Sequence, residues 1–220
     1  MSGELSGSDK SNASTSVTQP YATAQQPSKI QNRKYLMPYI ETHNSIPGIR
    51  GLMQFRPDIA LALNQLAQVV LADEASLSKS ERELIATFVS SGNECKFCMT
   101  SHAAIVSHLP EFGYDIIEAV RNDYMSAPIS DKLKALLHIA DKVRVSGRNV
   151  SESDVAAARQ QGASDLDIHD TVLIAAMFCM MNRYVDGLGA TTPDDPEFYA
   201  IVGKQRAAEG YLTKSVLVKD

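Results

Sequence analysis

Three side chains that could do chemistry together lie within one short stretch of the sequence, at Cys95, Cys98 and His102. The surrounding segment, residues 90–106, is mostly apolar and typical of a helix. Positions four apart share one face of a helix, so Cys98 and His102 can approach each other, with Cys95 in the first turn. Three interpretations are open: a disulfide redox centre, part of a metal site, or residues that pack in a core.

The C-x-x-C spacing of the two thiols favours the redox interpretation. The N-terminus of a helix has roughly half a positive charge, and Lys96 lies between the cysteines. Both features lower the pKa of a thiol and raise its thiolate fraction. Two such thiols can then close a disulfide.

The metal and packing interpretations remain as alternatives. A structural zinc site needs four ligands, whereas this segment supplies three, and Cys179 is isolated from them in the sequence. Buried free cysteines are common core residues. We therefore expect a redox dithiol with no metal and no bound cofactor.

A thiol redox site also needs a proton acceptor, and Glu83 is a possible partner for His102. Periodicity by itself indicates otherwise, because Glu83 shares the polar arc of its helix, and the opposite arc is apolar. The core arc consists of Leu84, Ile85, Phe88 and Val89, and the polar arc also includes Thr87, Ser90 and Ser91. Periodicity alone therefore predicts a solvated glutamate.

Composition and charge exclude several classes of protein. The chain has 220 residues, 44% of them hydrophobic and 21% charged, which is ordinary for a globular protein. A net charge of -5 without long runs of like charge argues against nucleic acid as a partner. No apolar stretch is long enough to cross a membrane, the N-terminus lacks a secretory pattern, and three cysteines do not form a disulfide framework. We expect a cytoplasmic protein.

The chain divides into a polar N-terminal segment and a helical remainder. Residues 1–30 contain thirteen Ser, Thr and Gln and few large apolar side chains, so we predict a disordered tail that is dispensable for activity. Residues 31–220 form the predicted domain, and from about Asn44 apolar positions recur with helical periods. We expect an all-α fold, a bundle of packed helices.

Capping and turn signals give the boundaries of these helices. Ser78 begins a capping box, and Asn93 is a candidate N-cap for the helix that contains the cysteines. Glycine and proline signals mark most of the helix ends. The predicted helices are 57–72, 78–91, 95–109, 111–122, 130–145, 151–161, 164–185 and 196–208.

Glu83, Cys95, Cys98 and His102 together fit the pattern E-x11-C-x2-C-x3-H. This pattern resembles the active-site signature of the AhpD-like alkylhydroperoxidases within the carboxymuconolactone decarboxylase superfamily. The segment RELIATFVSSGNECKFCMTSH resembles the motif region of the peroxidase-related branch, and MNRYVDGLG, residues 181–189, is similar to a segment near that branch's C-terminus. The resemblance covers about residues 46–189.

The resemblance implies an AhpD-like helical bundle that assembles as a homo-oligomer and reduces hydroperoxides through its cysteine pair. An external dithiol, either a thioredoxin-like or a lipoylated protein, would recycle the pair. It also implies a catalytic role for Glu83 beside His102. The family's best-studied type has a second histidine just before the latter cysteine, where this sequence has Phe97.

Two arguments assign different roles to the cysteines. Helix electrostatics favour Cys95 as the better thiolate, because it lies nearer the N-terminus. Proton-relay geometry and the resemblance favour Cys98 as the residue that attacks the peroxide, with Cys95 as the resolving thiol. We give the second argument more weight, because a departing alkoxide must also be protonated and His102 follows Cys98 by one turn.

Two other functions are compatible with the sequence. The protein could be a redox-sensing or structural helical oligomer whose disulfide changes its shape. It could also be a decarboxylase-like enzyme of the same superfamily, although such an enzyme does not require C-x-x-C. Structural interpretations fit the histidines His43, His108, His138 and His169 and the cluster Met177–Met181. Asn182 and Arg183 could serve an interface salt bridge as readily as the site.

Overall fold

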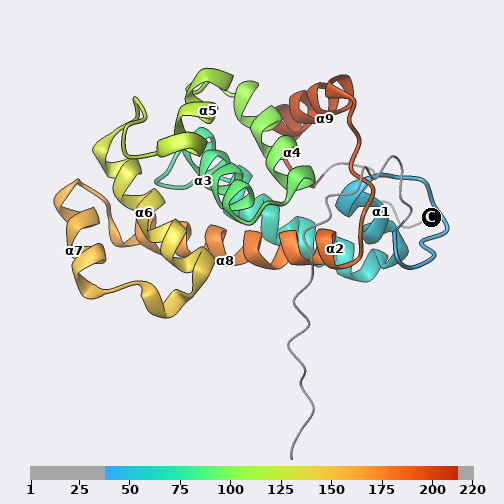
Figure 1. The fold of residues 1–220 in the computed structure, drawn as a ribbon, viewed down its shortest axis with the longest axis horizontal. Helices are drawn as coiled ribbons and strands as arrows, with labels where there is room; N and C mark the ends of the chain where they lie inside the picture. Colours follow the sequence, from blue (N-terminus) through green and yellow to red (C-terminus); the bar gives the residue numbers. More distant parts are fainter. Residues whose placement is uncertain (1–37, 213–220) are drawn as a thin grey trace, which may run out of the picture. The chain divides into compact units, whose positions relative to one another are not determined.

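A computed structural model describes residues 38–212 of the chain. The predicted tail, residues 1–30, lies outside the described residues. Within them every regular element is a helix and there is no strand, which confirms the all-α expectation (Figure 1). None of the described helices is long and apolar enough to cross a membrane.

The helices follow one another with short connections. Most of their boundaries agree with the sequence prediction to within a few residues. The elements are α1 (Gly48–Phe55), α2 (Pro57–Ala67), the π-helical segment η1 (Gln68–Ala72), α3 (Lys79–Gly92), α4 (Lys96–Ser107), α5 (Tyr114–Asp123), α6 (Asp131–Val145), the 3-10 segment η2 (Gly147–Asn149), α7 (Glu152–Gln160), α8 (Asp165–Gly187) and α9 (Pro196–Glu209).

Serine caps set the start of four helices. Ser78, Ser151 and Ser164 each form a complete capping box at the start of α3, α7 and α8. The hydroxyl of Ser130 accepts from the Leu133 N–H at the start of α6. These bonds satisfy N–H groups that otherwise have no partner within the helix, so the boundaries are encoded locally.

The turn between α3 and α4 differs from the sequence prediction. Asn93 is not the N-cap of α4; its backbone ends α3, with its N–H donating to the carbonyl of Val89. Glu94 follows in the left-handed region with φ 59°, and Cys95 becomes the N-cap of α4. The side chain of Asn93 contacts α8, where its Nδ2 donates to Oδ1 of Asn182 at 2.9 Å.

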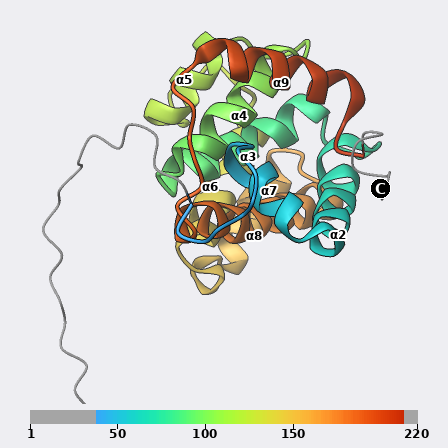
Figure 2. The same ribbon diagram turned by 90° about the vertical axis from the view of Figure 1, so that its right-hand side faces the viewer.

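Helices α3 and α4 lie side by side between two others. Helix α8 packs against α3 and helix α9 packs against α4, so the order in space is α9, α4, α3, α8 in both views (Figures 1 and 2). Helix α6 also packs on α3 and α8, and the core there is fully buried around Leu84, Ile85, Leu136 and Ile174. The cysteine segment therefore starts a helix that is enclosed on two sides.

Candidate active site

The two cysteines lie at the first turn of α4 and are both free thiols. Cys95 is fully buried and Cys98 is 4% exposed. The pKa of Cys98 is lowered, first by a hydrogen bond from Cys95 and then by His102 and Asn182, although burial opposes these. The pKa of Cys95 is raised by the same hydrogen bond and by burial. Of the two thiols, ionisation is therefore favoured at Cys98.

Glu83 and His102 form a buried pair between α3 and α4. Nδ1 of His102 lies 2.6 Å from Oε2 of Glu83, and the two side chains are 13% and 3% exposed. The solvated glutamate that periodicity predicts is therefore wrong. Its polar arc is buried because α4 covers that side of α3, so α3 is enclosed on both faces.

The imidazole of His102 is oriented by this contact. With Nδ1 donating to the carboxylate, Nε2 is left as the proton acceptor, and no described residue bonds to it. The edge of the ring also packs on Phe178, with centroids 4.6 Å apart at 90°. The arrangement matches a carboxylate–histidine pair that holds one ring nitrogen ready for proton transfer.

Tyr211 is a third member of the Glu83–His102 group, and the sequence analysis did not identify it. Its hydroxyl donates to Oε1 of Glu83 at 2.6 Å and lies 3.5 Å from Nδ1 of His102. Burial raises the pKa of Tyr211, and the neighbouring Glu83 raises it further, so the phenol stays protonated and can donate. Both carboxylate oxygens thus have a donor. No signal in the sequence links Tyr211 to a residue 128 positions earlier.

Hydrogen bonds with side chains hold the backbone of residues 210–212 at the site. The side-chain oxygen of Gln68 in η1 accepts from the N–H groups of Tyr211, at 2.7 Å, and Leu212, at 3.2 Å. Nη1 of Arg206 donates to the carbonyls of Gly210 and Tyr211. Gly210 has φ 70°, and a Cβ there would lie 2.5 Å from the Gln68 oxygen, so glycine is needed at this turn.

Asn182 belongs to the site, whereas its neighbour Arg183 does not. Asn182 is 1% exposed, its Nδ2 donates to Oγ of Ser90 at 3.1 Å, and its side chain hydrogen-bonds Cys98. Arg183 is exposed and donates to the carbonyl of Cys179. The Asn-Arg pair was noted in the sequence, but only the fold shows which side chain faces the thiol.

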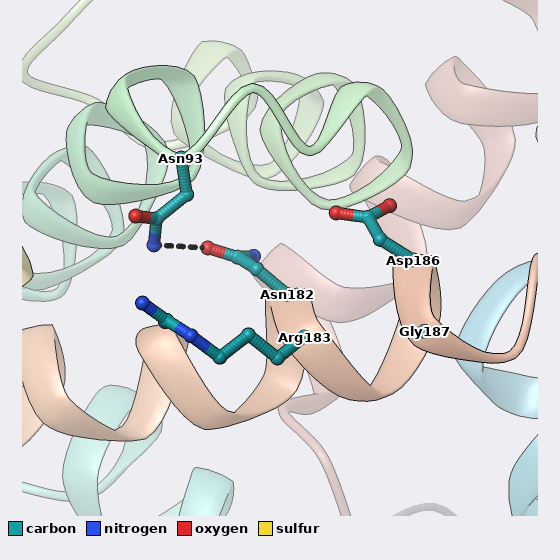
Figure 3. Close-up of a pocket in the computed structure, with 5 residues that line it drawn as sticks. All are labelled: Asn93, Asn182, Arg183, Asp186 and Gly187. Carbon is teal, nitrogen blue, oxygen red and sulfur yellow. Dashed lines mark hydrogen bonds between the residues drawn. The ribbon is translucent and has the colours of Figure 1, made fainter. Parts of the chain in front are cut away.

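A hollow of about 420 Å³ lies beside Asn182 and Asp186 of α8 (Figure 3). The residues that line it are Asn93, Asn182, Arg183, Asp186 and Gly187. Burial raises the pKa of Asp186, and a hydrogen bond with Cys95 opposes this. Cys95 therefore contacts the wall of this hollow, but it is fully buried itself.

A larger cavity of about 900 Å³ also borders the site. Cys98 and His102 both line it, and Cys95 is not among its lining residues. Most of the wall is apolar and comes from α1, α2, α4 and α8, including Ile49, Leu61, Ile105 and Met177. The side chains of Cys98 and His102 therefore open onto the same cavity.

Phe97 also lines the cavity, at the position where the best-studied relatives have a second histidine. It is 6% exposed and packs against Gly48, where a Cβ would lie 1.9 Å from the ring. Gly48 has φ 63°, so glycine is required there for two reasons. This position adds apolar surface instead of a second proton carrier.

The other candidates are placed away from this centre. His138 contacts Tyr124 and Asp154, and His169 contacts Asp170. The Met177–Met181 cluster mainly fills the core, with Met180 exposed. Within residues 38–212 no group of three or more His, Cys, Asp and Glu side chains is placed to hold a metal ion.

The sequence profile of the carboxymuconolactone decarboxylase family matches residues 57–141. The match includes Glu83, Cys95, Cys98 and His102 but ends before Asn182. The comparison with curated proteins gave no match.

Two solved structures are similar in fold. One is the alkylhydroperoxidase AhpD core of an uncharacterized peroxidase-related protein from Ralstonia eutropha JMP134, with 28% identity, a TM-score of 0.64, and coverage of 72% of this chain and 82% of that chain. The other is an uncharacterized peroxidase-related protein from Silicibacter sp. TM1040, with 26% identity, a TM-score of 0.62, and coverage of 70% and 79%.

Proposed function

We propose that this chain, which contains a carboxymuconolactone decarboxylase family domain and has an AhpD-like fold, is a thiol-dependent peroxidase that reduces hydroperoxides. One observation supports this most directly. The acidic thiol of Cys98 and the imidazole of His102, which contacts Glu83, face the same apolar cavity, so nucleophile and proton carrier can act on one bound molecule.

In the first step, the Cys98 thiolate attacks the terminal oxygen of a hydroperoxide. An S–O bond forms, the O–O bond breaks, and an alkoxide departs. His102 takes the thiol proton of Cys98 beforehand and gives it to the alkoxide, while Glu83 stabilises the imidazolium. The sulfur loses two electrons and the peroxide gains them. The products are a sulfenic acid on Cys98 and an alcohol.

In the second step, Cys95 condenses with the sulfenic acid. An S–S bond forms and water leaves, which takes the oxygen from Cys98. An external dithiol then reduces the disulfide by thiol–disulfide exchange and is itself oxidised. Cys95 is fully buried, so the reductant reaches the disulfide through the cavity beside Cys98 or after the first turn of α4 opens.

Steady-state peroxide consumption with a dithiol reductant tests the proposal. Continuous turnover supports a peroxidase, whereas a redox sensor would react once and stop. Absence of any reaction with hydroperoxides would reject both functions. A decarboxylase-like enzyme would act on its substrate without either cysteine.

Single-turnover experiments test the roles of the thiols. Cys98→Ser should abolish even one turnover, whereas Cys95→Ser should retain one turnover and leave a sulfenic acid that a dimedone probe traps on Cys98. Cys179→Ser, which changes the thiol outside the pair, is the matched control and should keep turning over. A probe adduct on Cys95 in the Cys98→Ser protein would reverse the assignment.

A further inference from the structure

The charges along the large cavity are unevenly balanced. Its lining contains one carboxylate, Asp58, which is paired with Arg56 through bonds of 3.0 and 2.8 Å. It also contains two arginines, Arg50 and Arg206. No carboxylate of the described residues lies within ion-pair distance of either arginine. In a chain with a net charge of -5, the arginines of this lining therefore outnumber its carboxylates.

The guanidinium of Arg206 has a fixed position, and some of its N–H groups have no partner among the described residues. Its Nη1 bonds to two backbone carbonyls, and its guanidinium lies 5.4 Å from the centroid of the Tyr211 ring. Nε and Nη2 have no hydrogen-bond partner among the described residues. A guanidinium with a fixed position and a free edge suits bidentate binding of a carboxylate.

The guanidinium of Arg206 is partly removed from solvent. Burial lowers the pKa of Arg206, and the positive charge of Arg50 lowers it further. Tyr211 opposes this by more than Arg50 contributes, and Glu209 and Glu83 oppose it by less. An anion beside both arginines would remove their repulsion and compensate the buried charge.

We propose that the cavity binds hydroperoxides with a carboxylate on an apolar chain, of the fatty acid type, and that Arg50 and Arg206 hold the carboxylate. The apolar wall accepts the chain, while the peroxide lies at Cys98 and His102. A volume of about 900 Å³ is within the range of small-molecule sites. This inference names the substrate class of the proposed peroxidase and therefore rests on that function.

An equilibrium experiment tests the site without requiring turnover. Isothermal titration calorimetry would compare an eighteen-carbon hydroxy fatty acid, the unreactive alcohol product, with its methyl ester. We expect the acid to bind roughly tenfold more tightly, the effect of a charge-assisted contact that is partly exposed to solvent. The ester retains the chain and lacks the charge.

Substitutions identify the residues that cause the preference. Arg50→Met should remove most of it. Lys204→Met, on the exposed face of α9 and outside the cavity lining, is the control and should keep it. Arg206→Met should also remove it, but this variant loses two backbone bonds, so Arg50→Met is the decisive one. Equal binding of acid and ester, or a preference that survives in Arg50→Met, would overturn the inference.

Kinetics separate this inference from the proposed function. The acid and ester hydroperoxides would be compared by kcat/KM, and the ratio should fall about tenfold in Arg50→Met. If neither hydroperoxide is turned over but the acid still binds through Arg50, the peroxidase proposal fails and the carboxylate site stands. If both are turned over equally by the wild-type protein, the carboxylate site fails and the peroxidase proposal stands.

Discussion

The acidity of Cys98 depends on a few named donors, and the first of them is the other thiol. Cys95 lies at the N-cap of α4, and its thiol donates a hydrogen bond to the sulfur of Cys98. This bond lowers the pKa of Cys98 and raises the pKa of Cys95. The helix N-terminus argument by itself assigned the lower pKa to Cys95. The hydrogen-bond donors around Cys98 therefore affect its pKa more than its greater distance from the helix N-terminus does.

The first prediction concerns the pH dependence of Cys98 alkylation. Because the pKa of Cys98 is lowered, its reaction with iodoacetamide should rise with pH through a midpoint below the ordinary thiol value of about 8.5 and then level off. Cys95→Ala removes the largest cause, so the midpoint should move to higher pH. Mass spectrometry of carbamidomethylated Cys98 measures both curves, and an unchanged midpoint would contradict the assignment.

The second prediction concerns Tyr211 as a positioning residue. Tyr211→Phe removes the donor to Oε1 of Glu83 and leaves the ring in place. A buried acceptor without its partner costs about 1–3 kcal/mol, so we expect kcat to fall roughly tenfold. The pH–rate profile should also change, because Tyr211 no longer donates to the carboxylate that contacts His102.

Two comparisons make the Tyr211 result specific. Tyr114→Phe changes an exposed tyrosine on α5 and should leave both the rate and the pH profile as they are. Thermal unfolding of each variant reports on stability. A Tyr211→Phe protein that loses stability but keeps the wild-type pH profile would show a purely structural role.

At the scale of elements, the close contact of α4 with α9 determines where the C-terminal segment enters the site. Gly203 of α9 faces the backbone of Ala104, and a Cβ there would lie 2.7 Å from the Ala104 carbonyl carbon. Helix α9 leads directly into the turn at Gly210 and then to Tyr211. The distance between the two helices therefore affects the distance between Tyr211 and Glu83.

The third prediction tests this contact. Gly203→Val should lower the free energy of unfolding by about 2 kcal/mol, because overpacking costs about 1–3 kcal/mol and the gain in helix propensity is less than about 1. Peroxide turnover should fall as well, because Tyr211 is displaced. Gly147→Val is the control, since nothing lies within 4 Å of a Cβ there. Equal urea midpoints for the two variants would show that α9 adjusts freely.

The π-helical segment η1 shows how a local irregularity serves the site. Gln68 begins it and binds the backbone of Tyr211 and Leu212. The buried guanidinium of Arg82 donates to the carbonyls of Val70 and Asp73 at its other end, at 3.0 and 2.6 Å. The sequence predicted one uninterrupted helix over 57–72, because periodicity does not distinguish a π turn from an α turn.

At the scale of the whole molecule, large apolar side chains remain exposed among the described residues. On α2 and the helices beside it they include Phe55, 44% exposed, and Ile59, 39% exposed. Val69 is 63% exposed and Ile201 is 62% exposed. Such surface is typical of an interface between protein chains. The Met177–Met181 cluster contributes little to it, because most of its side chains are buried.

The fourth prediction is that the protein is a homo-oligomer in solution. Light scattering at micromolar concentration should give at least twice the chain mass of 23.9 kDa, because apolar faces of this kind are usually covered by a second copy. Phe55→Glu together with Ile59→Glu should shift the protein towards lower mass. A wild-type mass of 23.9 kDa would contradict the prediction.

Local interactions explain what the sequence by itself determined. The side chains of Ser78, Ser130, Ser151 and Ser164 accept from N–H groups three positions away, so they define helix starts wherever the helices are packed. The spacing of Cys95, Cys98 and His102 is likewise local, since one helix turn brings them together. The class of fold and the core of the candidate site could be predicted for this reason.

Only the tertiary structure decided what depends on contacts between distant segments. Glu83 is buried because α4 covers its side of α3, and periodicity within one helix does not contain that information. Tyr211, Asn182 and Arg206 reach the site from α8 and the C-terminal end, roughly a hundred residues beyond the motif. Their positions follow from how the helices pack, and packing depends on the shapes of all the faces in contact, which a pattern of neighbouring residues does not specify.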